Sequence, residues 1–332
     1  MISKSILQKA AQKNIIESRQ VEPLYRFIQE QKINDIPDSR EEPLKFIRSF
    51  GDVFITLGVI LLVMAINMTS LQGYYYLLPV VGFVGLAEWI VRIRRLVLPG
   101  IAILLSILFF VNKAIPFGED NTALLGFGIM SFSSLLFYIR YKMPFSLLPF
   151  SIGLVAMSVV QIGMDVLENP FIFVGFGLVI FAIALWFDSR DTKRLSHLSD
   201  NAFWLYLLAA PLIVHGVMVS LLTTDQVWVG SFNKDVLMIG FFVVVFLVSL
   251  LIDRRAILIS TQLYVIYALT QLLQNQLSSA QDALIYILIG LAFFVIYFGT
   301  YWYKTRRLIF GFMSGNIISR YVPDLNTLDV KR

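Results

Sequence analysis

The chain has 332 residues, of which 58% are hydrophobic and 15% are charged, and its formal net charge is +5. Because soluble domains carry roughly 45–50% apolar and about 25% charged residues, this composition excludes an ordinary soluble protein. The chain contains no cysteine, which excludes disulfide bonds, thiol nucleophiles and thiolate metal sites.

Residues 1–48 predict a small cytosolic helical hairpin followed by a polar linker. Apolar residues recur at helical spacing in two short segments, at Ile6, Leu7, Ala10 and Ala11 and then at Val21, Leu24, Tyr25 and Ile28. Pro23 fits only near the beginning of the second helix, because further along its ring would clash with the preceding turn. A hairpin of this size cannot bury a core of its own. Its apolar stripe therefore covers either the rest of the chain, the membrane surface, or a cytosolic or membrane protein partner bound through residues 1–32.

Ten mostly apolar stretches follow, and each approaches the roughly 20 helical residues that cross a bilayer core. They span residues 50–69, 74–91, 96–111, 122–139, 144–164, 170–187, 201–222, 236–252, 256–273 and 283–302. The sequence thus predicts an all-α, polytopic membrane helix bundle of about ten transmembrane helices over residues 49–303, with the lipid bilayer as its surroundings. Residues 304–332 form a predicted basic cytosolic tail.

Basic residues at alternate connections predict the orientation of this bundle. All but two of the 27 lysines and arginines lie in the N-terminal segment, in alternate loops or in the C-terminal tail. Those in the loops and at the start of the tail are Arg92, Arg94, Arg95, Arg140, Lys142, Arg190, Lys193, Arg194, Arg254, Arg255, Lys304, Arg306 and Arg307. Short basic loops stay in the cytoplasm, so both termini are predicted to lie inside. No nucleic-acid partner is expected, because nucleic-acid binding would require a basic cluster on one soluble face.

Glycines recur within the predicted spans, at Gly82, Gly85, Gly126, Gly128, Gly153, Gly175 and Gly177. Lipid provides no hydrophobic driving force for the association of membrane helices, so the helices associate through close packing, which small residues allow. We therefore expect these positions to mark contacts between helices, without any need for a ligand.

The few polar side chains within the spans form the candidate intramembrane site. They are Asn67, Glu88, Gln161, His215, Gln262 and Tyr264, with Pro211 added as a helix breaker. Ionisable groups are costly in the membrane, so they usually face the bundle interior or water. Glu88 precedes Arg92 by four residues, a spacing that predicts an ion pair at the cytoplasmic boundary. A proton relay through Glu88 is the alternative.

The span over 201–222 contains both a proline and a histidine in its central part. Asp200 is predicted to cap the start of this helix, and Pro211 removes one of its hydrogen bonds. His215 lies about 6 Å further along the axis, at a rise of about 1.5 Å per residue. Two interpretations stay open: a neutral histidine hydrogen-bonded to a neighbouring helix, and a hydrated site for a substrate or a proton.

Motifs of several enzyme classes are missing from the sequence, so no catalytic residue is predicted. The only two histidines, His197 and His215, come without HExxH spacing or clustered carboxylates, which argues against a zinc site. The sequence contains neither a GxxxxGK(S/T) nucleotide loop nor a G-x-S-x-G elbow. We therefore expect no metal and no organic cofactor. The predicted outer loops hold two lysines and seven acidic residues, which disfavours an anionic external substrate.

Two stretches carry a resemblance to known sequences. LQKAAQKNIIESRQVEPLYRFI (7–28) resembles the opening of a family of bacterial membrane proteins, catalogued as a domain of unknown function, that places a soluble helical hairpin before a multi-span bundle. This chain has Asn14 where that family usually has glycine. AFWLYLLAAPLIVH (202–215) resembles a stretch of uncharacterised bacterial membrane proteins. The resemblance implies a location in the bacterial inner membrane and supplies no activity.

Two classes of function are compatible with these features. The first is a non-enzymatic membrane scaffold, sensor or regulatory component that acts through the hairpin and the inner loops. The second is a small-solute transporter, because ten spans with both ends inside is the layout of the drug/metabolite transporters. Those transporters consist of two inverted five-helix halves, and the two halves of this sequence show no match to each other.

Overall fold

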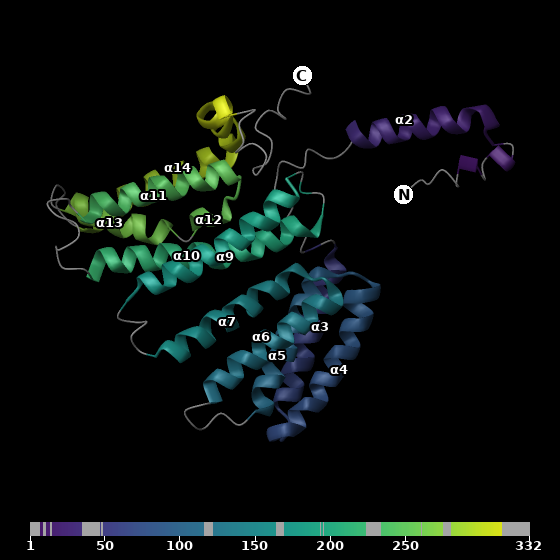
Figure 1. Ribbon diagram of the computed structural model, residues 1–332, viewed down its shortest axis with the longest axis horizontal. Helices are drawn as coiled ribbons and strands as arrows, with labels where there is room; N and C mark the ends of the chain where they lie inside the picture. The colour runs from purple at the N-terminus through teal and green to yellow at the C-terminus, as the bar shows by residue number, and fades with distance from the viewer. Residues whose placement is uncertain are drawn as a thin grey trace. The chain divides into compact units, whose positions relative to one another are not determined.

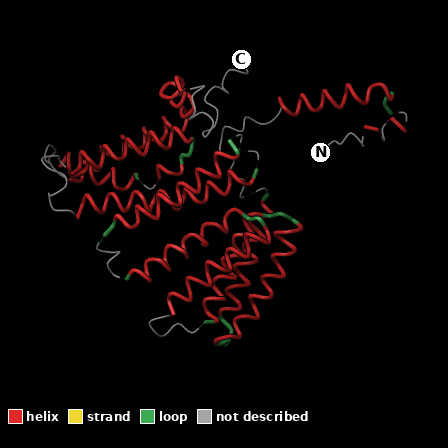
Figure 2. Tube along the Cα trace, viewed as in Figure 1, coloured by secondary structure: helices red, strands yellow, loops and turns green. Residues whose placement is uncertain are grey.

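A computed structural model describes residues 7–8, 11–13, 15–34, 47, 49–115, 122–163, 169–192, 194, 196–223, 234–259, 261–274 and 280–313. The chain divides into two compact units, Met1–Phe46 and Ile47–Arg332. Every regular element among the described residues is a helix (Figure 1 and Figure 2). The all-α prediction is therefore confirmed for this part of the chain.

The N-terminal unit contains a short 3-10 helix, Ser18–Gln20, that leads into α2, Val21–Asn34. Glu17 and Gln20 form a capping box, in which the Glu17 backbone amide donates to the Gln20 side chain over 3.0 Å. Pro23 lies in the first turn of α2, as predicted. Ile6, Ala10, Asn14, residues 35–46 and the side chain of Ile28 lie outside the described residues.

The second unit contains the remaining helices. Its first half comprises α3 (Phe50–Asn67), a 3-10 helix (Gly73–Tyr76), α4 (Leu77–Ala87), a π-helix (Glu88–Ile93), α5 (Val97–Ala114), α6 (Thr122–Tyr141), a 3-10 helix (Pro144–Ser146) and α7 (Leu147–Ile162). Its second half comprises α9 (Phe171–Arg190), α10 (His197–Thr223), α11 (Lys234–Ile252), α12 (Ala256–Ile259), α13 (Gln262–Gln274), α14 (Ala280–Phe310) and a 3-10 helix (Gly311–Met313).

Eight helical segments among the described residues are long and apolar enough to cross a membrane. They are Phe50–Asn67, Gly73–Ile93, Val97–Ala114, Ala123–Tyr141, Pro144–Ile162, Phe171–Arg190, His197–Leu222 and Leu284–Phe310, and they coincide with eight of the predicted spans. The predicted span over 236–252 is a shorter apolar helix. The predicted span over 256–273 is divided between α12 and α13. The helices fit a multi-pass membrane protein, whereas a count of ten spans stays a prediction.

Much of the helix surface is covered by large apolar side chains. Phe54 is 61% exposed, Phe293 68% and Ile296 65%. A water-soluble protein rarely exposes continuous apolar surface of this kind. In a bilayer the same side chains contact lipid, so the exposed faces of these helices match a membrane environment.

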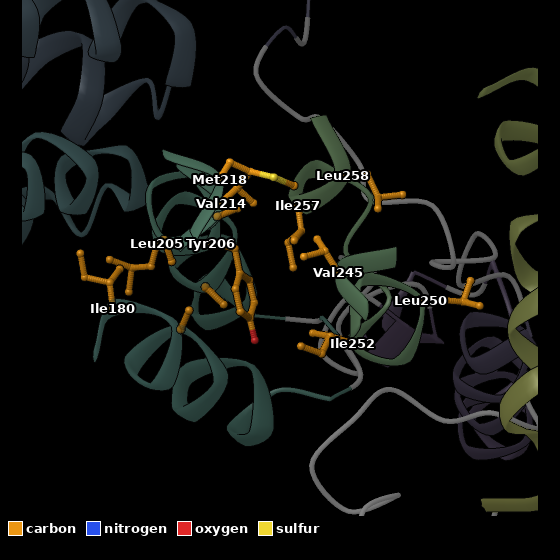
Figure 3. Packing of buried hydrophobic residues seen from close by; sticks show 14 of the residues in the cluster. Ile180, Leu205, Tyr206, Val214, Met218, Val245, Leu250, Ile252, Ile257 and Leu258 are labelled. Atoms are coloured by element: carbon orange, nitrogen blue, oxygen red, sulfur yellow. The ribbon is translucent and has the colours of Figure 1, made fainter. Parts of the chain in front are cut away.

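Two clusters of buried apolar side chains hold the second unit together. One cluster joins α3, α4 and α5 with Phe137 at the end of α6 and Phe145 just before α7. The other extends from Leu147 to Trp302 and includes residues of α9, α10 and α11. Figure 3 shows part of the second cluster, in which the ring of Tyr206 lies among aliphatic side chains.

Helices α9 and α10 pack side by side and approach most closely at glycines (Figure 1). A Cβ atom on Gly177 would lie 2.6 Å from Ile213 Cγ1 and 2.9 Å from the Ile213 backbone nitrogen. One on Gly216 would lie 2.7 Å from the carbonyl oxygen of Pro170. The predicted role of glycine in packing is confirmed at Gly128, Gly153 and Gly177. It is wrong at Gly82, Gly85 and Gly175, where no atom of another described element lies within 4 Å of the Cβ position.

Helix α10 begins earlier than the sequence predicts. The Leu198 amide donates to the Ser196 hydroxyl over 3.2 Å, and the Ser196 amide and hydroxyl donate to Asp191 over 2.8 and 2.7 Å. Asp200 therefore lies in the first turn of α10, and the prediction that it caps the helix is wrong. Its negative charge in the first turn still suits the helix dipole.

Candidate functional site

Three groups of polar side chains lie at the ends and in the interior of the second unit, and the largest is a buried cluster of charges. Its centre is Arg254, in the turn between α11 and α12, and Asp188, near the end of α9. Arg254 donates to Asp188 over 2.6 Å, and both side chains are almost completely buried, at 3% and 2% exposed. Arg254 also donates to the Ser199 hydroxyl over 2.9 Å and to its carbonyl oxygen over 3.1 Å.

A second ion pair lies beside the first. Arg194 donates to the Asp253 carboxylate over 3.0 Å, and these side chains are only 6% and 7% exposed. The indole nitrogen of Trp302, in α14, donates to the other carboxylate oxygen of Asp253 over 2.7 Å. Both Arg194 and Asp253 have positive φ angles, 53° and 61°. This backbone conformation is costly for residues other than glycine, so the surrounding contacts must hold the two turns in place.

Arg306 completes this charge cluster, which we define as Asp188, Arg194, Asp253, Arg254 and Arg306. Its guanidinium donates to the carbonyl oxygens of Leu250 over 3.0 Å and Leu251 over 3.1 Å, at the end of α11. The last carbonyls of a helix have no partner within it and carry partial negative charge. A buried cation at this point stabilises the end of α11 and links it to α14.

The charge cluster joins four helices through contacts that exclude water. It contains three cations and two anions, and each of the two carboxylates accepts hydrogen bonds from an arginine. Separating either pair would leave a charge buried without its partner, which is strongly unfavourable. Two polar atoms at the cluster, Arg194 Nε and Tyr206 Oη, have no hydrogen-bond partner among the described residues. The charge cluster is therefore suited to holding the helix ends together. Both of its carboxylates are paired with an arginine, so neither is free to transfer a proton.

The second polar group surrounds Glu88, in the π-helix at the end of α4. Arg92 donates to Glu88 over 3.0 Å, which confirms the ion pair predicted from their spacing. Arg140, at the end of α6, donates two hydrogen bonds to Glu88, over 2.8 and 3.0 Å. The Tyr141 hydroxyl also donates to Glu88, over 3.1 Å. Four donors thus converge on one carboxylate, and the Glu88 side chain remains 35% exposed. This geometry anchors α4 to α6 and argues against Glu88 as a proton relay.

The third group brings together two of the predicted candidate residues. Nδ1 of His215 in α10 and the hydroxyl of Tyr264 in α13 share a hydrogen bond, and their ring centroids lie 6.2 Å apart. His215 is exposed and Tyr264 half-buried. A hydrogen bond to another helix is the arrangement expected of a histidine in helix packing. The alternative, a hydrated site at His215 for a substrate or a proton, predicts that water reaches this position.

The other candidate residues do not gather around this pair. Asn67 accepts a hydrogen bond from Lys113, whose ammonium group lies 5.3 Å from the centroid of the Tyr76 ring. Gln161 is exposed in the last turn of α7. Gln262 starts α13, and Pro211 lies exposed inside the continuous helix α10. The predicted intramembrane site is therefore divided among separate places along the bundle.

The basic residues that predicted the topology differ in how deeply they are buried. The exposed ones are Arg92, Arg94, Arg95, Arg140, Lys142, Arg190 and Lys304. Arg254 and Arg306 are buried, as is the Arg194 side chain, while Arg255 and Arg307 are half-buried and Lys193 lies outside the described residues. The sequence analysis did not identify Asp188 as the partner of Arg254 or Asp253 as the partner of Arg194. The available signal was that each carboxylate directly precedes a basic turn at the end of an apolar stretch.

Comparison with known proteins adds no functional assignment. A scan against protein-family models finds no match, and searches of curated proteins and of solved structures also find none. The resemblance of residues 7–28 to a bacterial membrane family therefore stays a prediction.

Proposed function

We propose that the protein is a non-enzymatic component of the bacterial inner membrane that acts as a scaffold, sensor or regulator, with both termini in the cytoplasm. The distribution of basic residues supports this orientation, and the resemblance of residues 7–28 supports the bacterial location. The charge cluster opposes separation of α9, α10, α11 and α14. A bundle held together in this way supports a scaffold role.

The observation that carries this proposal is the apolar surface of the N-terminal unit. Leu24 is 39% exposed, Phe27 57% and Ile15 72%, while Val21 is buried. An amphipathic helix in a unit too small for a substantial core gains stability by placing such side chains against a partner. We propose that residues 1–32 bind a cytosolic or membrane protein and that the bundle anchors this interaction to the membrane.

Deleting residues 1–32 should leave the bundle inserted and folded but remove the bound partner. The paired substitution Leu24→Ser with Phe27→Ser should have the same effect, because it removes the exposed apolar side chains and leaves the helix in place. The measurement is quantitative identification of proteins that co-purify with each variant in mild detergent. Arg26→Gln, an exposed polar change on the same helix, is the matched control. Failure of the truncated chain to insert, or its degradation, would instead make residues 1–32 part of the fold.

A small-solute transporter is the second candidate, and one observation favours it. Among the described residues, the stretch over 256–273 is interrupted by a turn at Thr261, between α12 and α13, and Tyr264 lies in the first turn of α13. Interrupted helices at membrane depth are tolerated where they are buried in protein or line a water-filled cavity, and they form substrate sites in many transporters. The hydrogen bond between His215 and Tyr264 brings two polar side chains together near this interruption.

Water access to position 215 separates the two candidates. The chain has no cysteine, so His215→Cys provides a single thiol for labelling with a membrane-impermeant reagent from each side. A transporter should show labelling that a transported solute blocks, whereas a packed helix contact should show none from either side. Arg190→Cys and Gln72→Cys, both at exposed positions, serve as references for the inner and outer faces. Labelling of both references from the same side would contradict the proposed topology.

A further inference from the structure

Two neighbouring turns of the second unit carry a patch of exposed positive charge. The first turn, taken together with the end of the π-helix that leads into it, contains Arg92, Arg94 and Arg95. The second turn, taken together with the end of α6, contains Arg140 and Lys142. All five side chains are exposed. We propose that this basic patch binds the phosphate headgroup of an anionic phospholipid, a site that goes beyond the scaffold or transporter function proposed above.

The two turns are held together, so their charges act on the same region. Glu88 accepts hydrogen bonds from Arg92 of the first turn and from Arg140 of the second. Behind these contacts, the Cβ position of Gly100 lies 3.0 Å from Val91 Cγ2 and 3.1 Å from Met143 Sδ. Gly100 therefore packs tightly against side chains next to both turns, which supports their close spacing.

One carboxylate cannot neutralise five cations. Glu88 engages Arg92 and Arg140, whereas no carboxylate within the described part of the chain forms an ion pair with Arg94, Arg95 or Lys142. The backbone φ angles of Arg95 and Lys142 are 55° and 52°, so both residues sit in sharp turns with left-handed conformation. The patch therefore retains unneutralised positive charge that is open to an external anion.

The surroundings of the patch favour a lipid over a free anion. Trp89 is 51% exposed, Ile93 72% and Ile139 56%, so apolar surface directly adjoins the cations. The Arg94 guanidinium lies 5.3 Å from the centroid of the Trp89 ring, and Lys142 lies 5.5 Å from that of Tyr138. Tryptophan and tyrosine are enriched at the headgroup level of membranes. A phospholipid can contact both surfaces at once, with its phosphate on the cations and its acyl chains on the apolar side chains.

The test compares lipid retention by the full-length protein. The paired substitution Arg95→Gln with Lys142→Gln removes two unpaired charges, and Arg190→Gln with Lys304→Gln is the matched control at other exposed basic positions whose side chains also lie over aromatic rings. Each protein is reconstituted in nanodiscs of phosphatidylcholine and phosphatidylglycerol in equal parts. It is then released into neutral detergent, and the bound lipids are counted by native mass spectrometry.

We expect the parent and control proteins to retain phosphatidylglycerol selectively, and the Arg95 and Lys142 variant to retain it about tenfold less. Glu88→Gln should increase retention, since it removes the negative charge that partly neutralises the patch, while the amide oxygen can still accept a hydrogen bond between the two turns. This second variant keeps all basic residues, so a change in topology cannot explain its result. Equal retention by all variants, a loss of the same size in the control, or no selectivity for phosphatidylglycerol in the parent would overturn the proposal. Displacement of the lipid by millimolar inorganic phosphate alone would likewise overturn it in favour of a free-anion site.

Discussion

Replacing Arg254 with methionine should lower the free energy of unfolding by about 3–5 kcal/mol, the usual cost of removing one partner from a buried ion pair. Methionine retains much of the side-chain length but leaves the Asp188 carboxylate buried without its arginine. The substitution also removes the donor to the Ser199 hydroxyl and carbonyl oxygen. The combined loss makes this the most damaging single change that we expect in the charge cluster.

Thermal unfolding of the purified protein in detergent measures this effect. Arg190→Met is the control, because Arg190 is an exposed cation at the end of the same helix as Asp188 and surface changes usually stay within about 0.5 kcal/mol. The double variant Asp188→Leu with Arg254→Met should recover part of the stability, since it removes both charges together. Equal stability of the Arg254 variant and the control would show that the pair does not hold the helix ends.

Gly177→Ala should destabilise the contact between α9 and α10 by about 1–3 kcal/mol, the typical cost of overpacking a close interface. The added methyl group would overlap Ile213 Cγ1 at 2.6 Å and the Ile213 backbone nitrogen at 2.9 Å. The Ile213 side chain can change rotamer, but the backbone nitrogen moves only if α10 moves. The two helices must therefore separate locally or shift along one another.

Gly175→Ala on the same helix is the matched control. No atom of another element in the described part of the chain lies within 4 Å of its Cβ position, and alanine favours a helix over glycine by about 1 kcal/mol. We expect this variant to unfold at the same temperature as the parent protein or slightly higher, and the Gly177 variant to unfold lower. If both variants behave alike, the close approach at Gly177 does not contribute to stability.

Local features of the sequence determined the helices and the short-range contacts. An apolar stretch of about 20 residues becomes a helix in a membrane because lipid cannot satisfy the backbone polar groups, and eight predicted spans coincide with membrane-length helices. The Glu88–Arg92 pair was predictable for a related reason, since residues four apart share one helix face. The sequence also singled out Gly177, but it equally singled out Gly175, and nothing local distinguishes the two.

Only the tertiary structure decided which distant residues meet. Arg254 and Asp188 are 66 residues apart, and Arg140 and Glu88 are 52 apart, so no periodicity connects them. An arginine next to the end of an apolar stretch has the same sequence pattern whether it is exposed, as Arg190 is, or faces a buried carboxylate, as Arg254 does. The stretch over 256–273 was predicted as one span, although its sequence contains the polar run Ser260-Thr261-Gln262 at the place where α12 gives way to α13. Hydrophobicity depends on each residue alone, whereas the burial and pairing of a side chain depend on which other helices pack beside it.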